Sequence, residues 1–94
     1  MYAGFLSGPI EGVPNHMVDF ACAVVRFHGM RPGADVFNPE DLPKDRDARH
    51  NALRRLEALF ESESVVMLPG WQACPLCAAE HALAEYLKIP VVYF

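Results

Sequence analysis

The sequence has little of what marks secreted, membrane-spanning or nucleic-acid-binding proteins. Only three of its 94 residues are cysteines, an odd number that argues against a framework of paired disulfides. No apolar run approaches the roughly 20 residues that cross a bilayer, and residues 1–12 lack the basic start of a secretory signal. Eight Lys and Arg against twelve Asp and Glu give a net charge of −4 without a basic cluster. We therefore expect a cytoplasmic protein that binds neither membranes nor a nucleic acid polymer.

The composition is that of a single folded domain. Hydrophobic residues make up 52% of the sequence and charged residues 21%, a balance that excludes disorder. A chain of this length can bury roughly 60–65% of the surface that it exposes when unfolded. No repeat or low-complexity segment interrupts it. We therefore predict one domain over residues 1–94.

Short apolar runs alternate with helical patterns along the whole chain. The predicted strands cover residues 2–7, 35–37, 64–68 and 89–94, and the predicted helices cover 16–28, 45–61 and 75–87. This βαβαβαβ order implies an α/β fold with a short parallel sheet of about four strands and helices on both faces. Ligands of such sheets bind at the carboxyl ends of the strands, which here are the loops at 7–15, 38–44 and 69–74.

The apolar residues of the first two predicted helices indicate which faces are buried. Asn15 is expected to cap the first helix, which we predict to be mostly buried. The second helix is expected to have one apolar stripe and one polar face. The expected buried residues are Val18, Ala21, Cys22, Val24, Val25 and Phe27 in the first helix, and Ala52, Leu53, Leu56, Leu59 and Phe60 in the second.

Glu80 is the most informative polar residue. In the third predicted helix it lies nearer to the apolar stripe of Leu76, Leu83 and Leu87 than to the polar stripe that includes His81. A carboxylate there is partly desolvated, which costs free energy unless hydrogen bonds or a function compensate. Two interpretations are open at this point: a boundary glutamate that bonds helix-terminal N–H groups, or a catalytic group.

Cys74 and Cys77, at the start of the same helix, allow three interpretations. A redox pair suits a helix start, where the dipole favours a thiolate, but too little chain follows Cys77 for a thioredoxin-type fold. Zinc would add His81 and need a distant fourth ligand such as Cys22 or His50, since structural zinc sites usually have four. We favour the third interpretation, in which two small, soft side chains pack at a helix start.

The loop after the first strand and the tryptophan after the third are weaker signals. Gly8-Pro9-Ile10-Glu11-Gly12 could cradle a phosphate or a ribose, but it lacks the spacing of a dinucleotide fingerprint and the lysine of a P-loop. A plain strand-to-helix turn is therefore favoured. Trp71 is equally suited to stack on a base or to cap the core.

Taken together, these segments resemble the nucleoside 2-deoxyribosyltransferase-like family, in particular its small bacterial and phage members of uncharacterised function. The likeness spans nearly the whole chain. It rests on Phe5-Leu-Ser-Gly-Pro-Ile-Glu-Gly12, on Phe20 and Gly29, on Asn38-Pro39, and on Val65-Val-Met-Leu-Pro-Gly-Trp71 followed by Glu80. The Leu-Pro-Gly-Trp element followed by a glutamate is the more specific part. The resemblance implies a flavodoxin-like three-layer sandwich.

By this resemblance Glu80 is the candidate catalytic nucleophile. In the family a helix glutamate attacks the anomeric carbon of a nucleoside or nucleotide. Departure of the base then builds oxocarbenium character that a carboxylate can capture, and water or a second base takes the sugar. The resemblance thus implies cleavage or transfer at an N-glycosidic bond. The alternative is a non-catalytic module that binds or sequesters a nucleotide derivative.

The resemblance also implies which residues contact the small nucleoside or nucleotide. Phe5 stands where relatives have tyrosine, and Glu63 stands where relatives often carry an aspartate. The expected substrate-binding residues are Phe5, Gly8, Pro9, Ile10, Gly12, Asn38, Glu63, Gly70, Trp71 and Cys74. No metal and no other cofactor is expected. Because family members complete their sites across a dimer, we expect a homodimer or a larger homo-oligomer.

Two departures from the family bear on the substrate. Relatives commonly place a serine at the position of Cys74 and a glycine at the position of Leu76, where a bulky side chain crowds the helix terminus that would accept an anion. Glu11 adds negative charge to the loop that faces the same space. These changes weigh against a 5′-phosphate and favour an unphosphorylated nucleoside, another nucleotide derivative or a loss of catalysis.

Overall fold

The four predicted strands are present and form one parallel sheet. The computed structural model describes residues 1–94, and its sheet has the strand order β2-β1-β3-β4. The strands are β1 (Gly4–Ser7), β2 (Val36–Phe37), β3 (Val65–Met67) and β4 (Val91–Tyr93). β1 and β3 lie at the centre and are buried along their whole length, because helices cover both of their faces.

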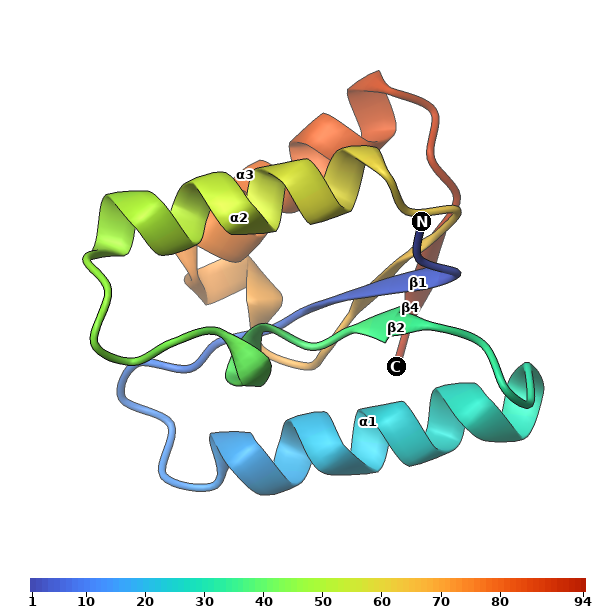
Figure 1. The fold of residues 1–94 in the computed structure, drawn as a ribbon, viewed down its shortest axis with the longest axis horizontal. Coiled ribbons are helices and arrows are strands. Elements are labelled where there is room, and N and C mark those ends of the chain that lie inside the picture. The colour runs from blue at the N-terminus through green and yellow to red at the C-terminus, as the bar shows by residue number, and fades with distance from the viewer.

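Three helices complete a flavodoxin-like three-layer sandwich, as predicted (Figure 1). α1 (His16–Met30) covers one face of the sheet, and α2 (Ala48–Phe60) and α3 (Pro75–Tyr86) lie together over the other face. Two short 3₁₀ turns, Pro39–Asp41 and Trp71–Ala73, follow β2 and β3. Neither turn is predicted from the sequence, because each is only three residues long and lies within a loop.

The alternation of side chains along the strands divides the core into two halves. Leu6 and Val66 point towards α1 and pack with its phenylalanines, Phe20 and Phe27. The residues that alternate with them along β1 and β3 point to the opposite face of the sheet. There they pack with Ala58, Leu59, Cys77 and Ala84 of α2 and α3. The two halves share the central strands, so the sheet is the common wall of both.

The buried faces of the helices are narrower than the sequence analysis predicts. In α1 only Phe20, Ala23 and Phe27 are buried, and in α2 only Arg55, Ala58 and Leu59. Several residues expected inside are instead exposed, among them Val18, Ala21, Cys22, Val25, Leu53 and Phe60. The prediction was wrong for these residues because each helix touches a small sheet along one line, which a narrow stripe of side chains fills.

α3 differs from its predicted orientation in the same way. Its buried side chains are Cys77, Glu80 and Ala84, whereas Leu76 and Leu87 are exposed. The small side chains of Cys77 and Ala84 on the face towards the sheet let the helix approach closely, and the leucines lie together along one side of that contact. Glu80 is therefore at the centre of the buried stripe and not at its boundary.

The helix starts use side-chain caps at two places. Asn38 accepts a hydrogen bond from the backbone N–H of Glu40, and Asp47 accepts one from the backbone N–H of His50. Asn15 lies at the N-cap position of α1, but its side chain makes no capping hydrogen bond, contrary to the prediction.

None of the three helices has both the length and the apolar character that a bilayer span requires.

The close approach of β1 to α1 gives a test of the packing on that face. A Cβ added to Gly4 would lie 2.7 Å from two ring atoms of Phe27, so Gly4→Ala forces the buried ring to move. We expect the free energy of unfolding to fall by about 1–3 kcal/mol. Gly29→Ala is the control: nothing lies within 4 Å of its added Cβ, and alanine favours the helix by up to about 1 kcal/mol. Urea titrations of both variants measure the difference, and equal stabilities would contradict the described packing.

Candidate functional site

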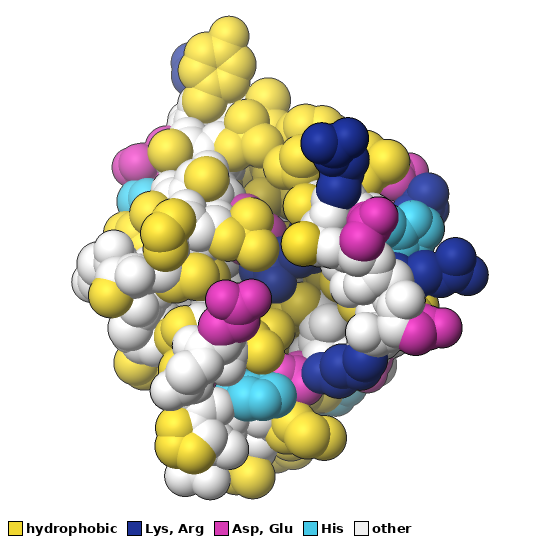
Figure 2. Space-filling view, turned by 90° about the vertical axis from the view of Figure 1, so that its left-hand side faces the viewer, with side chains coloured by type: hydrophobic (Ala, Val, Ile, Leu, Met, Phe, Trp, Pro, Cys, Tyr) yellow, Lys and Arg dark blue, Asp and Glu magenta, His cyan; other side chains and the backbone are white.

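A cleft opens at the carboxyl edge of the sheet, where the connections of the central strands diverge. β1 leads to α1 on one face, and its neighbour β3 leads to α3 on the other, so the loops that leave them separate. Parallel α/β sheets bind their ligands at such a point. The cleft has a volume of about 900 Å³, and Figure 2 shows this side of the molecule, hollowed, with a basic side chain inside the hollow.

Apolar side chains and glycines form most of the cleft wall. The loop after β1, the segment around Pro39–Lys44, the first half of α2 and the start of α3 all contribute to it. Its charged side chains are Glu11, Lys44 and Arg55. Lys44 also lies 3.4 Å from Glu40, at the exposed rim. A wall of this kind suits a small molecule with a flat apolar part and a few polar atoms.

A buried ion pair lies beneath the cleft. Arg55 of α2 donates two hydrogen bonds to Glu80 of α3, from Nε to Oε2 at 2.8 Å and from Nη2 to Oε1 at 2.7 Å. Ser7, the last residue of β1, donates from Oγ to Oε1 at 2.7 Å. Only 1% of Glu80 and 6% of Arg55 is exposed. The carboxylate is therefore held from two directions in a site without bulk water.

The ion pair determines the charge state of its cation. Burial alone would lower the pKa of Arg55, but the hydrogen bonds and the negative charge of Glu80 outweigh that effect, so the pKa is raised above its ordinary value. Arg55 remains charged, and Glu80 neutralises it. Because Nε and Nη2 face Glu80 and Nη1 has no hydrogen-bond partner, the guanidinium keeps free donors where it borders the cleft.

Cys74, at the N-cap position of α3, and Cys77, within the helix, border the same cleft. Burial raises the pKa of Cys77 to about 12, and a hydrogen bond with Cys74 acts in the same direction. At neutral pH Cys77 is thus protonated, whereas redox attack and zinc binding both use the thiolate. No three His, Cys, Asp or Glu side chains are placed to share a metal ion. The buried and protonated thiol of Cys77 supports the packing interpretation.

Half of the expected binding residues line the cleft: Gly8, Pro9, Ile10, Gly70 and Cys74. Gly70 has a φ of 89°, which a residue with a side chain rarely adopts, and a Cβ added there would lie 3.4 Å from Pro9 of the loop after β1. Glu80 is not part of the cleft wall, whereas its cation Arg55 is.

The other expected binding residues do not line the cleft and make their contacts elsewhere in the structure. Phe5 is fully buried and stacks on Phe37, with 5.2 Å between ring centroids. Asn38 is used as a cap, and Trp71 stacks on His81 at 4.2 Å, away from the cleft wall. Gly12 lies in an exposed turn. The structure therefore does not bring these residues together with the cleft.

Glu63 lies at the opposite edge of the sheet. It precedes β3, whereas the cleft follows that strand, and its carboxylate is 4.0 Å from the guanidinium of Arg31 on the surface. Its place near the amino end of β3 removes it from the cleft. The role that the family resemblance implies for it has no counterpart in this geometry.

Arg55 and Ser7 are the residues that the sequence analysis missed. Arg55 comes three residues after Ala52 and four before Leu59, so helical spacing already places it on the apolar stripe of α2. A charge on such a stripe indicates a buried partner. Glu80 carries the same signal on α3, and the two together would have predicted the ion pair.

The comparisons with known proteins give the family of the chain. A family model described as a domain of unknown function (DUF4406) matches residues 2–93. The chain belongs to this family. Among solved structures it is similar to the TIR domain of the Toll-related receptor TRR-2 from Hydra magnipapillata, with a TM-score of 0.64, 14% identity and coverage of 99% of this chain and 69% of that one. At that identity the likeness shows the fold alone. The comparison with curated proteins found no match.

The ion pair makes a specific prediction about stability. Arg55→Met leaves the Glu80 carboxylate buried without its cation, so the free energy of unfolding should fall by about 3–5 kcal/mol. The double variant Arg55→Met with Glu80→Met removes both charges and should recover most of that loss. Arg54→Met is the control, because Arg54 meets Glu57 at 3.4 Å on the surface and such pairs contribute less than about 1 kcal/mol. Equal losses in Arg54→Met and Arg55→Met, or no recovery in the double variant, would contradict the assignment.

Proposed function

We propose that the cleft binds a nucleoside or a nucleotide derivative without cleaving it, and that Glu80 serves as the counter-ion of Arg55. The observation that carries this proposal is the state of the carboxylate: both of its oxygens accept hydrogen bonds, from Arg55 and from Ser7, and 1% of the residue is exposed. Catalysis by Glu80 through an N-glycosidic cleavage or transfer stays a prediction from the family resemblance.

A nucleophile has different requirements. Its attacking oxygen must approach the anomeric carbon to roughly 3–3.5 Å with a free lone pair. Glu80 does not border the cleft, and the bidentate contact with Arg55 withdraws electron density from both of its oxygens. Cleavage would require Glu80 to leave Arg55, with both charges then desolvated and apart. That cost makes binding the better-supported function.

The chemistry of the cleft supports a ligand with little negative charge. Since Glu80 neutralises Arg55, the guanidinium offers hydrogen-bond donors without a net positive field, which suits a hydroxyl or carbonyl oxygen. Glu11 on the opposite loop repels a phosphate, and Leu76 occupies space at the start of α3. The apolar wall, with Ile10 and Leu42, suits the faces of a base.

Binding and cleavage are separated by two assays on the same panel of ribonucleosides, deoxyribonucleosides and their monophosphates. We expect at least one compound, at ten times its Kd, to stabilise the fold by about 1.4 kcal/mol and to raise Tm by roughly 6–11 °C. We expect no free base on chromatography after prolonged incubation. Leu76→Trp, which fills the cleft from an exposed position, should abolish the shift. Leu53→Trp is the control, because Leu53 is similarly exposed but lies outside the cleft.

Three results would overturn the proposal, and each contradicts a different part of it. Release of base by the native protein and not by Glu80→Gln would establish the nucleophile in place of the counter-ion. Absence of any stabilisation across the panel would show that the cleft binds none of these compounds and would contradict the proposal. A shift that survives Leu76→Trp would place the binding site elsewhere on the molecule.

A further inference from the structure

α1 carries a second apolar stripe on the side that faces away from the sheet. The stripe consists of Val18, Cys22, Val25 and Gly29, which follow one another at intervals of four, three and four residues. Val18 is 60% exposed and Val25 is 72% exposed, and Cys22 and Gly29 are exposed as well. This spacing keeps one seam of side chains on one side of a helix, as in helices that pack lengthwise against another helix.

No residue of the chain covers this stripe, and the buried side of α1 is satisfied separately. Phe20, Ala23 and Phe27 already make the contact with the sheet. A monomer would therefore keep two valines in water on the outer side of the same helix. Isolated exposed valines are ordinary, but a continuous seam without a charge along it indicates a contact surface.

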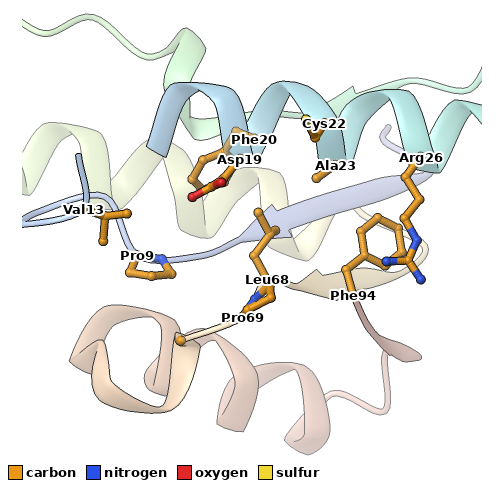
Figure 3. Close-up of a pocket in the computed structure, with 11 residues that line it drawn as sticks. Pro9, Val13, Asp19, Phe20, Cys22, Ala23, Arg26, Leu68, Pro69 and Phe94 are labelled. Carbon is orange, nitrogen blue, oxygen red and sulfur yellow. The ribbon is translucent and has the colours of Figure 1, made fainter. Parts of the chain in front are cut away.

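Two charged residues flank the seam on one side. Asp19 follows Val18 and Arg26 follows Val25, so they lie two turns apart on the same side of α1 (Figure 3). Both border a smaller cavity of about 430 Å³ between α1 and the end of the sheet. Arg26 lies 4.2 Å from the ring centre of Phe94, and neither charge forms an ion pair within the chain.

The order of these charges is self-complementary. When two copies of a helix pack antiparallel across a two-fold axis, residues on one flank meet residues of the same flank in reverse order. The acidic residue near the start of α1 then meets the basic residue near its end, and this happens twice. The antiparallel arrangement also places each positive helix terminus beside a negative one.

We propose that α1 packs antiparallel against α1 of a second copy of this chain, with the two-fold axis close to Cys22. Asp19 of each copy faces Arg26 of the other, and Val18 and Val25 close the seam between them. The interface uses the outer side of α1 and not the Glu80–Arg55 pair. The inference therefore does not depend on the proposed ligand.

The first test is the mass in solution. Sedimentation of the native protein at micromolar concentration should give twice the 10.5 kDa of one chain. Val25→Glu, at a position already 72% exposed, should leave the circular dichroism unchanged and give the monomer. Leu53→Glu, on the exposed surface of α2, is the control and should remain a dimer. A native monomer, or a dimer that survives Val25→Glu, would overturn the proposal.

A charge exchange tests the antiparallel order. Asp19→Arg and Arg26→Asp should each weaken the dimer by at least several-fold in dissociation constant, because each places like charges together twice. The double variant restores opposite charges and should return the dissociation constant to near the native value. If the double variant loses as much dimer affinity as the two single variants lose together, the pairing of Asp19 with Arg26 is contradicted.

Disulfide cross-linking of Cys22 tests the position of the two-fold axis. Oxygen with copper–phenanthroline as catalyst removes two electrons and two protons from a pair of adjacent thiols and joins them as a disulfide. We expect a cross-linked dimer that forms in the variant Cys74→Ser with Cys77→Ser and is lost in Cys22→Ser. If the dimer forms but Cys22 does not cross-link, α1 does not cross its partner near Cys22, and the proposed geometry is wrong.

Discussion

The bidentate contact between Arg55 and Glu80 is the interaction on which the rest of the site depends. It joins α2 to α3, and the hydroxyl of Ser7 extends it to the end of β1. Desolvating two charges costs several kcal/mol, which their attraction repays only with good geometry and satisfied hydrogen bonds. Its contribution lies in fixing one arrangement of three elements, because an alternative packing of either helix would leave a buried charge alone.

That arrangement sets the chemistry of the cleft above it. An arginine fixed by its own carboxylate offers donors at a defined position, and the low exposure of the pair strengthens the hydrogen bonds that those donors make. The same contact occupies the carboxylate that the family resemblance assigns to catalysis. The Glu80 carboxylate can either pair with Arg55 or attack the sugar of a substrate. In this structure it pairs with Arg55. Fold likeness alone would not have separated these roles.

Local patterns were sufficient for most of the fold. The apolar runs and helical stretches predicted the order of all seven elements, and parallel topology then placed the cleft at the correct edge of the sheet. Helix faces were harder, because apolar residues such as Val18 and Leu53 occur on more than one side of each helix. Arg55 was missed because only the apolar residues of its helix were used to define the buried stripe. Trp71 and Glu63, expected in the site from the resemblance, lie in contacts that only the tertiary structure determines.

Nuclear magnetic resonance of the arginine side chains tests the central contact directly. In ¹⁵N-labelled protein at neutral pH, the Nε–H of Arg55 should give a separate signal that exchanges slowly with water, because it is buried and bonded to Glu80. The Nε–H of Arg54, in the exposed half of the same helix turn, should exchange rapidly. Glu80→Gln should accelerate the exchange at Arg55 alone. Rapid exchange at Arg55 in the native protein would contradict the account and free Glu80 for the role of nucleophile.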